Sequence, residues 1–119
     1  MSETYSPRER IRKKKDFAGL YKNGACFRGK YFNVIFLANG LEHSRMAAVS
    51  SRKVGNAVHR NKARRRARDL FRRHKGELTI PVDILVIAKK GVDEAEWKDV
   101  REQYLAAMRF VYRKMAVRN

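Results

Sequence analysis

The sequence predicts an α+β fold, a two-layer α/β sandwich in which helices pack on one small sheet. Short runs of aromatic and β-branched residues alternate with segments whose apolar residues recur every three or four positions. A nearly continuous apolar run separates the last two of these helical segments, as expected of a buried strand. The 119 residues suit a single domain, 1–119, with one modest core.

The first element is expected to be a short helix that follows a basic leader. Residues 1–12 are charged and lack an apolar stripe, so they are predicted to be flexible. Asp16 is the predicted N-cap and Gly24 the predicted stop of the helix. Phe17 and Tyr21 lie one turn apart between them and would give the helix an aromatic face.

Two strands are predicted next. Residues 25–38 are rich in aromatic and β-branched residues and should form a strand that bends or splits near Gly29. One face of this strand is apolar and suits a core, with Phe32, Val34 and Phe36. The alternate face is mixed and suits a partly open surface, with Tyr31, Asn33 and Ile35. Residues 45–51 predict a second, shorter strand.

The middle helix, predicted over residues 56–74, combines dense positive charge with an apolar stripe. The stripe consists of Ala63, Ala67, Leu70 and Phe71. The opposite side carries Asn61, Arg65, Arg68 and Arg72. In a disordered basic tail, no such charge-free stripe is expected. This segment should therefore fold as a helix and display its cations to a polyanion.

The rest of the chain predicts a strand and a helix. Residues 81–89 read as a buried central strand, in which Asp83 is expected to be a structural acid at the start. The last helix should open at residues 93–96, where acids suit its positive end. Its apolar positions are typical of a core-packing face: Trp97, Val100, Tyr104, Met108, Val111 and Met115.

The charge of the chain indicates its kind of partner. Lys and Arg number 29 against 12 Asp and Glu, a formal net charge of +17, and this self-repulsion favours a polyanionic partner. Nucleic acid is the commonest such partner, and an anionic membrane surface is the rival. The sequence has no transmembrane run and no apolar signal segment, so we expect a cytoplasmic protein that does not bind membranes.

Cysteine and histidine predict neither a disulfide nor a metal site. Cys26 is the only cysteine, so an internal disulfide is excluded. The three histidines, His43, His59 and His74, lie in separate segments and are expected to be surface residues. The sequence shows no pair of histidines, no carboxylate cluster and no arrangement of a nucleophile with a base. No catalytic residue is therefore predicted.

The segment K-V-G-N-A-V-H-R-N-K, which begins at Lys53, resembles the signature of the bacterial ribonuclease P protein family. Three arginines follow it in the family's register, and Lys62 is a conservative change from the family's Arg. The resemblance covers about residues 10–112. Ala47 and Val49 depart from the Gly and Ser that are more frequent in the family, and Ile35 stands where some members have an aromatic residue.

The resemblance implies a fold like that of ribosomal protein S5 domain 2. The implied order is α-β-β-β-α-β-α, with a left-handed β-α-β crossover around the basic helix. Physical reasoning alone favours the right-handed form, so the handedness rests on the resemblance.

The resemblance also implies a function. Ribonuclease P is a ribonucleoprotein that removes the 5′ leader of precursor tRNA, with the chemistry carried by a catalytic RNA and its Mg²⁺ ions. One copy of the protein is expected to bind one catalytic RNA as well as the precursor tRNA. The residues predicted to contact RNA are Lys53, Asn56, Arg60, Asn61, Lys62, Arg64, Arg65 and Arg68. Those predicted to form a cleft for the single-stranded leader are Phe17, Tyr21, Tyr31, Asn33 and Ile35.

Three other functions remain open at this point. A structural RNA-binding protein of the ribosomal type has similar size and charge. A DNA-binding regulator is disfavoured because a strand, and not the first helix of a helix-turn-helix, precedes the basic helix. A nuclease that acts without RNA is disfavoured because the sequence offers no catalytic groups for it.

Overall fold

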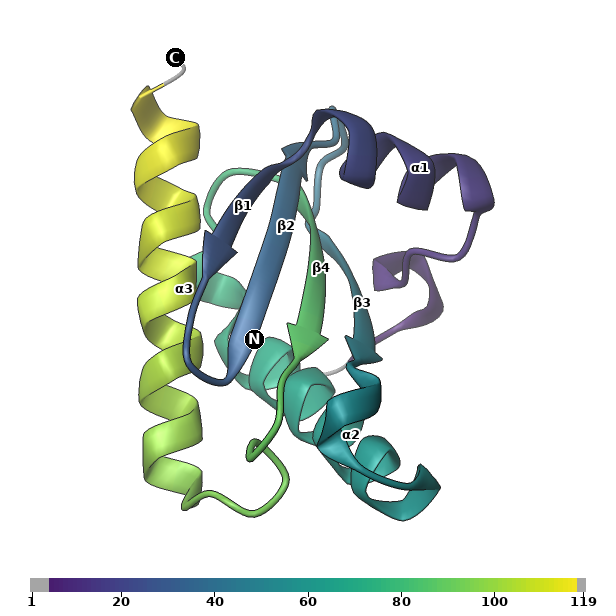
Figure 1. Cartoon of the computed structure of the whole chain (residues 1–119). Coiled ribbons are helices and arrows are strands. Elements are labelled where there is room, and N and C mark those ends of the chain that lie inside the picture. The colour runs from purple at the N-terminus through teal and green to yellow at the C-terminus, as the bar shows by residue number, and fades with distance from the viewer. Residues whose placement is uncertain (1–4, 118–119) are drawn as a thin grey trace.

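The computed structural model describes residues 5–117, which form a sheet with helices on both of its faces (Figure 1). In chain order the main elements are α1 (Lys14–Asn23), β1 (Ala25–Arg28), β2 (Phe32–Ala38), β3 (Arg45–Ser50), α2 (Ala57–His74), β4 (Val82–Ala88) and α3 (Trp97–Val117). Three short 3-10 helices join them: η1 (Pro7–Glu9), η2 (Arg52–Val54) and η3 (Lys75–Glu77). This order confirms the predicted one, including the split of the first strand at Gly29.

The sheet has four strands in the order β1-β2-β4-β3. β2 pairs antiparallel with both β1 and β4, whereas β3 pairs parallel with β4. β4 is therefore a central strand, as its apolar sequence predicts. In Figure 1, β3 and β4 both point down, and the chain passes from β3 on the right, through α2 behind the sheet, to β4 on its left. This path is the left-handed crossover that the family resemblance implies.

The main core lies between the sheet and the helices α2 and α3. Phe32, Val34 and Phe36 of β2 are buried there, which confirms the face predicted from alternation. The apolar stripe of α2 is fully buried, with Ala63, Ala67, Leu70 and Phe71 at 0% exposure. Helical and strand periodicities thus predict correctly which of these side chains are buried. They do so because burial of apolar surface is the main favourable contribution to folding.

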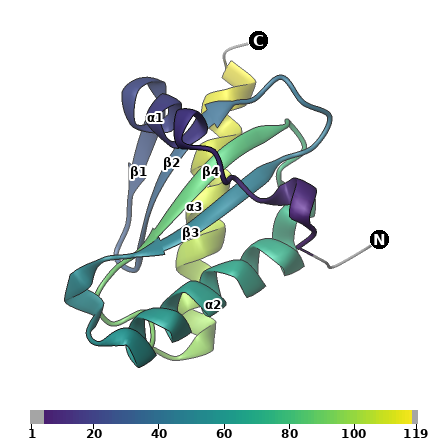
Figure 2. The same cartoon turned by 90° about the vertical axis from the view of Figure 1, so that its right-hand side faces the viewer.

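The N-terminal segment is packed from Tyr5 onward, so the prediction of a flexible leader is wrong for residues 5–12; residues 1–4 lie outside the described residues. The Tyr5 hydroxyl donates to the Met46 carbonyl oxygen at 2.6 Å, and Ile11 is buried. Lys75, the first residue of η3, donates to Glu9 at 2.8 Å. Figure 2, viewed from the β3 side, shows this segment running from α1 past β3 toward α2.

Two predicted helix starts also need correction. α1 begins at Lys14 with Lys13 as N-cap, so Asp16 lies inside the first turn, where its carboxylate is 3.5 Å from Arg45 of β3. α3 begins at Trp97, not at residue 93, because Asp93 is needed elsewhere: it is 1% exposed and hydrogen-bonded to α2. The prediction relied on the preference for acidic residues at a helix start. The hydrogen bond between Asp93 and His59 joins residues 34 positions apart, and no local pattern indicates it.

Close packing explains where α1 ends. Gly24 follows the helix with a φ of −73°, so no left-handed turn is required there. A Cβ at this position would lie 2.5 Å from the Leu20 carbonyl oxygen and 2.7 Å from Cγ2 of Ile35. Glycine at this position therefore lets α1 sit directly against β2.

Asp83 is a structural acid, as predicted. It accepts two hydrogen bonds from Arg45, at 2.9 and 2.6 Å, and one from Asn39 at 2.9 Å. The hydrogen bonds that Arg45 donates to Asp83 raise the pKa of Arg45. Because Arg45 also faces Asp16, this group fixes α1 to the edge of the sheet.

None of the helices described between residues 5 and 117 is both long enough and apolar enough to cross a membrane.

Candidate nucleic-acid interface

The start of α2 is set by two residues of the K-V-G-N motif. Gly55 has a φ of 137°, a conformation that strongly favours glycine, and it turns the chain into the helix. Asn56 caps the helix: its Oδ1 accepts hydrogen bonds from the backbone amides of Val58 at 3.1 Å and His59 at 3.3 Å. Asn56, which is predicted to contact RNA, therefore also stabilises the start of α2 as its N-cap.

The outer side of α2 presents a cationic surface. Six of the predicted RNA contacts are exposed on α2 and the turn before it: Lys53, Asn56, Asn61, Lys62, Arg65 and Arg68. Arg60 and Arg64 are partly exposed, and Arg64 donates to Oδ1 of Asn61. The helix thus separates its charged residues from its buried stripe as predicted, while the RNA contacts themselves stay predictions.

Other arginines of α2 have partners within the chain. Arg66 donates to the carbonyl oxygens of Val92 and Ala95, at 2.8 and 2.7 Å. Arg72 and Arg73 both pair with Asp69. Burial acts to raise the pKa of Asp69, but the hydrogen bonds from the two arginines outweigh it and lower the pKa. These residues anchor or balance the helix, and the predicted contact set omits them.

The opposite face of the sheet is only partly covered. α1 packs on it through Leu20, which is 1% exposed. We call the rest of this surface the open face; its partly buried apolar residues are Phe17, Ile35, Leu37, Val49 and Ile87. Phe17 and Ile35 therefore come together in one cluster, as the predicted cleft requires.

A hollow of about 470 Å³ lies beside Phe17. We call it the Phe17 hollow; its walls include Tyr5, Arg10, Arg12, Phe17, Val49 and Arg68. Arg68 comes from α2 and Phe17 from α1, so this hollow joins the basic helix to the open face. The sequence predicts both residues but gives no sign that they share a surface.

A second hollow, of about 450 Å³, lies at the other end of the open face. We call it the lysine hollow; it is lined by Lys30, Asn33, Ser51, Lys53, Ile87, Lys89 and Lys90. Asn33 Oδ1 is buried and has no hydrogen-bond partner within the described part of the chain. Its lysines make this hollow a site suited to anions.

The strand register joins the two hollows. Val49, which lines the Phe17 hollow, is opposite Ile87, and Ile87 is opposite Asn33. Ile87 and Asn33 both line the lysine hollow. Neighbouring strands lie about 4.8 Å apart, so this row across three strands spans roughly 10 Å.

Two aromatic residues of the predicted cleft lie elsewhere. Tyr31 precedes β2, so strand alternation does not apply to it, and its side chain lies against α3 beside Asp99 and Glu102. Its predicted place on the same strand face as Asn33 and Ile35 is therefore wrong. Tyr21 is 62% exposed and lines neither hollow.

Sequence reasoning also missed three lysines of the lysine hollow. Lys30 lies in the turn between β1 and β2, whereas Lys89 and Lys90 directly follow β4. Lys89 donates to the Gly29 carbonyl oxygen at 2.7 Å, which links the two segments. The antiparallel pairing of β2 with β4 is the signal that brings them together, and it was not part of the sequence-based prediction.

The family model for Ribonuclease P matches residues 5–112, which includes both hollows and α2. The chain belongs to the ribonuclease P protein family. It is 40% identical over 109 residues to the Ribonuclease P protein component of Thermotoga maritima, covering 88% of this chain and 93% of that protein. The protein of the same name from Streptococcus pneumoniae is 36% identical over 107 residues, covering 88% and 87%.

Solved ribonuclease P proteins share the fold. The structure from Thermotoga maritima superposes with a TM-score of 0.76 at 38% identity, over 85% of this chain and 96% of that one. The structure from Staphylococcus aureus gives a TM-score of 0.77 at 31% identity, over 87% and 94%. Membership of this family makes the chain an RNA-binding protein of tRNA processing.

Proposed function

We propose that this ribonuclease P protein binds a catalytic RNA through α2 and the single-stranded 5′ leader of precursor tRNA on its open face. The observation that carries the proposal is the continuity between the two surfaces. Arg68 of α2 shares the Phe17 hollow with Phe17, and the row Val49–Ile87–Asn33 leads from there to the lysine hollow. One protein thereby spans the enzyme's RNA and the substrate's leader.

The shape of α2 suits a folded RNA. The major groove of an RNA helix is deep and narrow, so side chains contact its backbone rather than its base edges. Arg65 and Arg68 are exposed on a rigid helix whose other side is buried in the core. Arginine forms bidentate hydrogen bonds with phosphate, which favours it at such a docking surface.

The open face suits an unpaired strand of any sequence. Binding without sequence preference combines stacking of bases on aromatic rings with cations that follow the backbone. Phe17 offers a ring at one end of the face, and the lysine hollow offers cations at the other. Asn33, whose Oδ1 has no partner among residues 5–117, adds a hydrogen-bonding group to the lysine hollow.

In this proposal the chemistry belongs to the RNA and the Mg²⁺ ions that it binds. The one cluster of potential metal ligands in residues 5–117 contains a histidine, His59, with Asp93 and Glu94. Mg²⁺ prefers oxygen ligands alone, so this cluster does not fit the catalytic ion. The protein's part is to bind and orient, with one copy per RNA, in the cytoplasm.

Reconstitution with a bacterial ribonuclease P RNA tests the proposal. At a low Mg²⁺ concentration that leaves the RNA alone inactive, adding the protein should restore cleavage of a precursor tRNA at its mature 5′ end. The protein without RNA should not cleave. The variant Arg65→Ala with Arg68→Ala should restore less activity, because it removes two phosphate contacts.

A matched control removes the same charge from α3. Arg109→Ala with Arg113→Ala changes two exposed arginines that line neither the Phe17 hollow nor the lysine hollow and should restore activity normally. Failure of the wild-type protein to stimulate the RNA would refute the proposal and leave a structural RNA-binding role of the ribosomal type. Cleavage by the protein alone would refute it in favour of a protein nuclease.

A further inference from the structure

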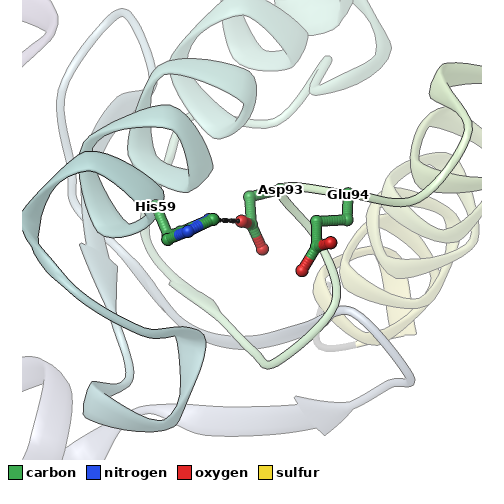
Figure 3. Close-up of side chains that lie close together, drawn as sticks. All are labelled: His59, Asp93 and Glu94. Atoms are coloured by element: carbon green, nitrogen blue, oxygen red, sulfur yellow. Dashed lines mark hydrogen bonds and ion pairs between the residues drawn. The ribbon is translucent and has the colours of Figure 1, made fainter.

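Three potential metal ligands meet away from both hollows. His59 lies in the first turn of α2, and Asp93 and Glu94 lie in the loop that joins β4 to α3 (Figure 3). His59 Nδ1 is 2.5 Å from Asp93 Oδ2, and ligand atoms of all three residues lie within 4.8 Å of one another. In Figure 3, Asp93 stands between the other two, with its second oxygen on the side of Glu94. We call this group the His59 cluster.

Asp93 is a buried carboxylate that the protein satisfies only in part. The residue is 1% exposed, and Oδ2 is occupied by His59. Its other oxygen, Oδ1, is buried and has no hydrogen-bond partner among residues 5–117. An unpaired buried acceptor costs on the order of 1–3 kcal/mol, and more when it is charged. A cation at Oδ1 would remove this cost.

No side chain in the described structure supplies that cation. Arg66 contacts this loop, but its Nη1 donates to the carbonyl oxygens of Val92 and Ala95 on either side of the pair. Arg66 therefore holds the loop in place and leaves Asp93 Oδ1 unpaired. Glu94 is exposed, so its side chain can adjust toward an ion.

We propose that His59, Asp93 and Glu94 form a binding site for a divalent transition-metal ion of the zinc class. One imidazole nitrogen with two carboxylate oxygens suits Zn²⁺ or Mn²⁺, whereas Ca²⁺ and Mg²⁺ favour oxygen alone. The ion binds Nδ1 of His59 in place of the hydrogen between Nδ1 and Oδ2 and contacts both oxygens of Asp93, so that Oδ1 gains a partner. Nε2 then carries the hydrogen of the neutral ring. Water completes the coordination on the exposed side.

The bound ion would connect the first turn of α2 to the loop between β4 and α3, and so fix the position of the helix that carries the proposed RNA-binding residues. His59 lies within the helical turn that Asn56 caps, and Asp93 lies 34 residues further along the chain. An ion that binds only the folded state raises the free energy of unfolding. The increase grows with the logarithm of the ratio of the free ion concentration to the dissociation constant. The inference is independent of the proposed function, since it requires no RNA.

Calorimetric titration of the full chain with Zn²⁺ tests the site. We expect one high-affinity equivalent in the wild-type protein. His59→Ala and Glu94→Gln should each weaken it at least about tenfold, since each removes a direct ligand. The matched changes His43→Ala and Glu96→Gln, outside the cluster, should leave it unchanged. Because Glu94 is exposed, Glu94→Gln is expected to fold even if a change at the buried Asp93 does not.

Thermal unfolding gives a second readout. Saturating Zn²⁺ should raise the midpoint of the wild-type protein and of the two control variants, but not that of Glu94→Gln. Absence of Zn²⁺ binding by the wild-type protein would overturn the inference. Binding that survives both His59→Ala and Glu94→Gln would overturn it too, because the ion would then lie elsewhere, for example at the exposed Cys26.

Discussion

The two faces of the sheet are built from the same strands but are covered to different extents. The face toward α2 and α3 is a dry core in which Phe32, Val34 and Phe36 are at most 2% exposed. The open face alternates with it residue by residue, yet among residues 5–117 only α1 and the N-terminal segment pack there. The difference indicates that one short strand can bury its even-numbered residues in the core and leave its odd-numbered ones for the proposed leader surface.

The same division runs through α2. Its stripe at Ala63, Ala67 and Leu70 is fully buried, while Arg65 and Arg68 between them are exposed. The helix therefore owes its position to the core and is available, on its other side, for a polyanion. If this comparison is right, changes on one face should alter stability and changes on the other should alter binding.

The largest expected effect is on stability, from a change on the core side. Phe71→Ala should lower the free energy of unfolding by about 3–5 kcal/mol, because a fully buried ring leaves a cavity. Phe17→Ala on the open face should cost only roughly 1–2 kcal/mol, since its ring is partly buried. Urea unfolding of both variants measures the contrast. Equal losses would mean that the open face is as much a core as the other.

The next effect is on RNA binding, from the outer side of α2. Replacing Arg65 and Arg68 by Ala should lower the salt dependence of RNA affinity by about one to two units of slope in a log–log plot, because two phosphate contacts are lost. Fluorescence titrations across a salt series measure the slope. The Arg109→Ala, Arg113→Ala protein is the control, and an unchanged slope in the α2 variant would mean that these arginines do not contact phosphate.

The smallest effect concerns the N-terminal segment and pH. Burial acts to raise the pKa of Glu9, but hydrogen bonds from Lys75 and Ser6 outweigh it and lower the pKa below the ordinary 4.5. Glu9 therefore contributes stability that is complete above pH 4.5 and is lost as the pH falls through its lowered pKa. The advantage of the wild-type protein over Glu9→Gln should shrink across that range.

Unfolding at pH 6.5 and again well below pH 4.5 checks this expectation. A constant difference between the two proteins would show that the contact of Glu9 with Lys75 does not depend on the charge of Glu9.

Periodicity explains which parts could be predicted from the sequence. The stripe of α2 and the alternation of β2 depend on neighbours a few residues away, so patterns in the sequence reveal them. The exposed cations of α2 follow from the same projection. The central position of β4 follows from its continuous apolar run.

Long-range pairing explains what could not be predicted. Lys30 and Lys89 meet only because β2 pairs with β4, and Tyr5 packs only because η1 lies against β3. From the sequence, Asp93 is predicted to be an acid at a helix start, whereas in the structure it lies in a loop and is hydrogen-bonded to His59. Each of these contacts joins residues more than thirty positions apart, where local patterns carry no information.

The most direct test of the account compares precursor and mature tRNA. Both should bind the reconstituted enzyme, and the wild-type protein should favour the precursor because only the precursor has a leader to place on the open face. Phe17→Ala should reduce this preference about tenfold, as expected for the loss of one stacking contact. Tyr112→Ala, which removes a partly exposed aromatic residue of α3, should leave it intact. A preference that is unchanged in Phe17→Ala, or equally reduced in Tyr112→Ala, would contradict the assignment of the leader to the open face.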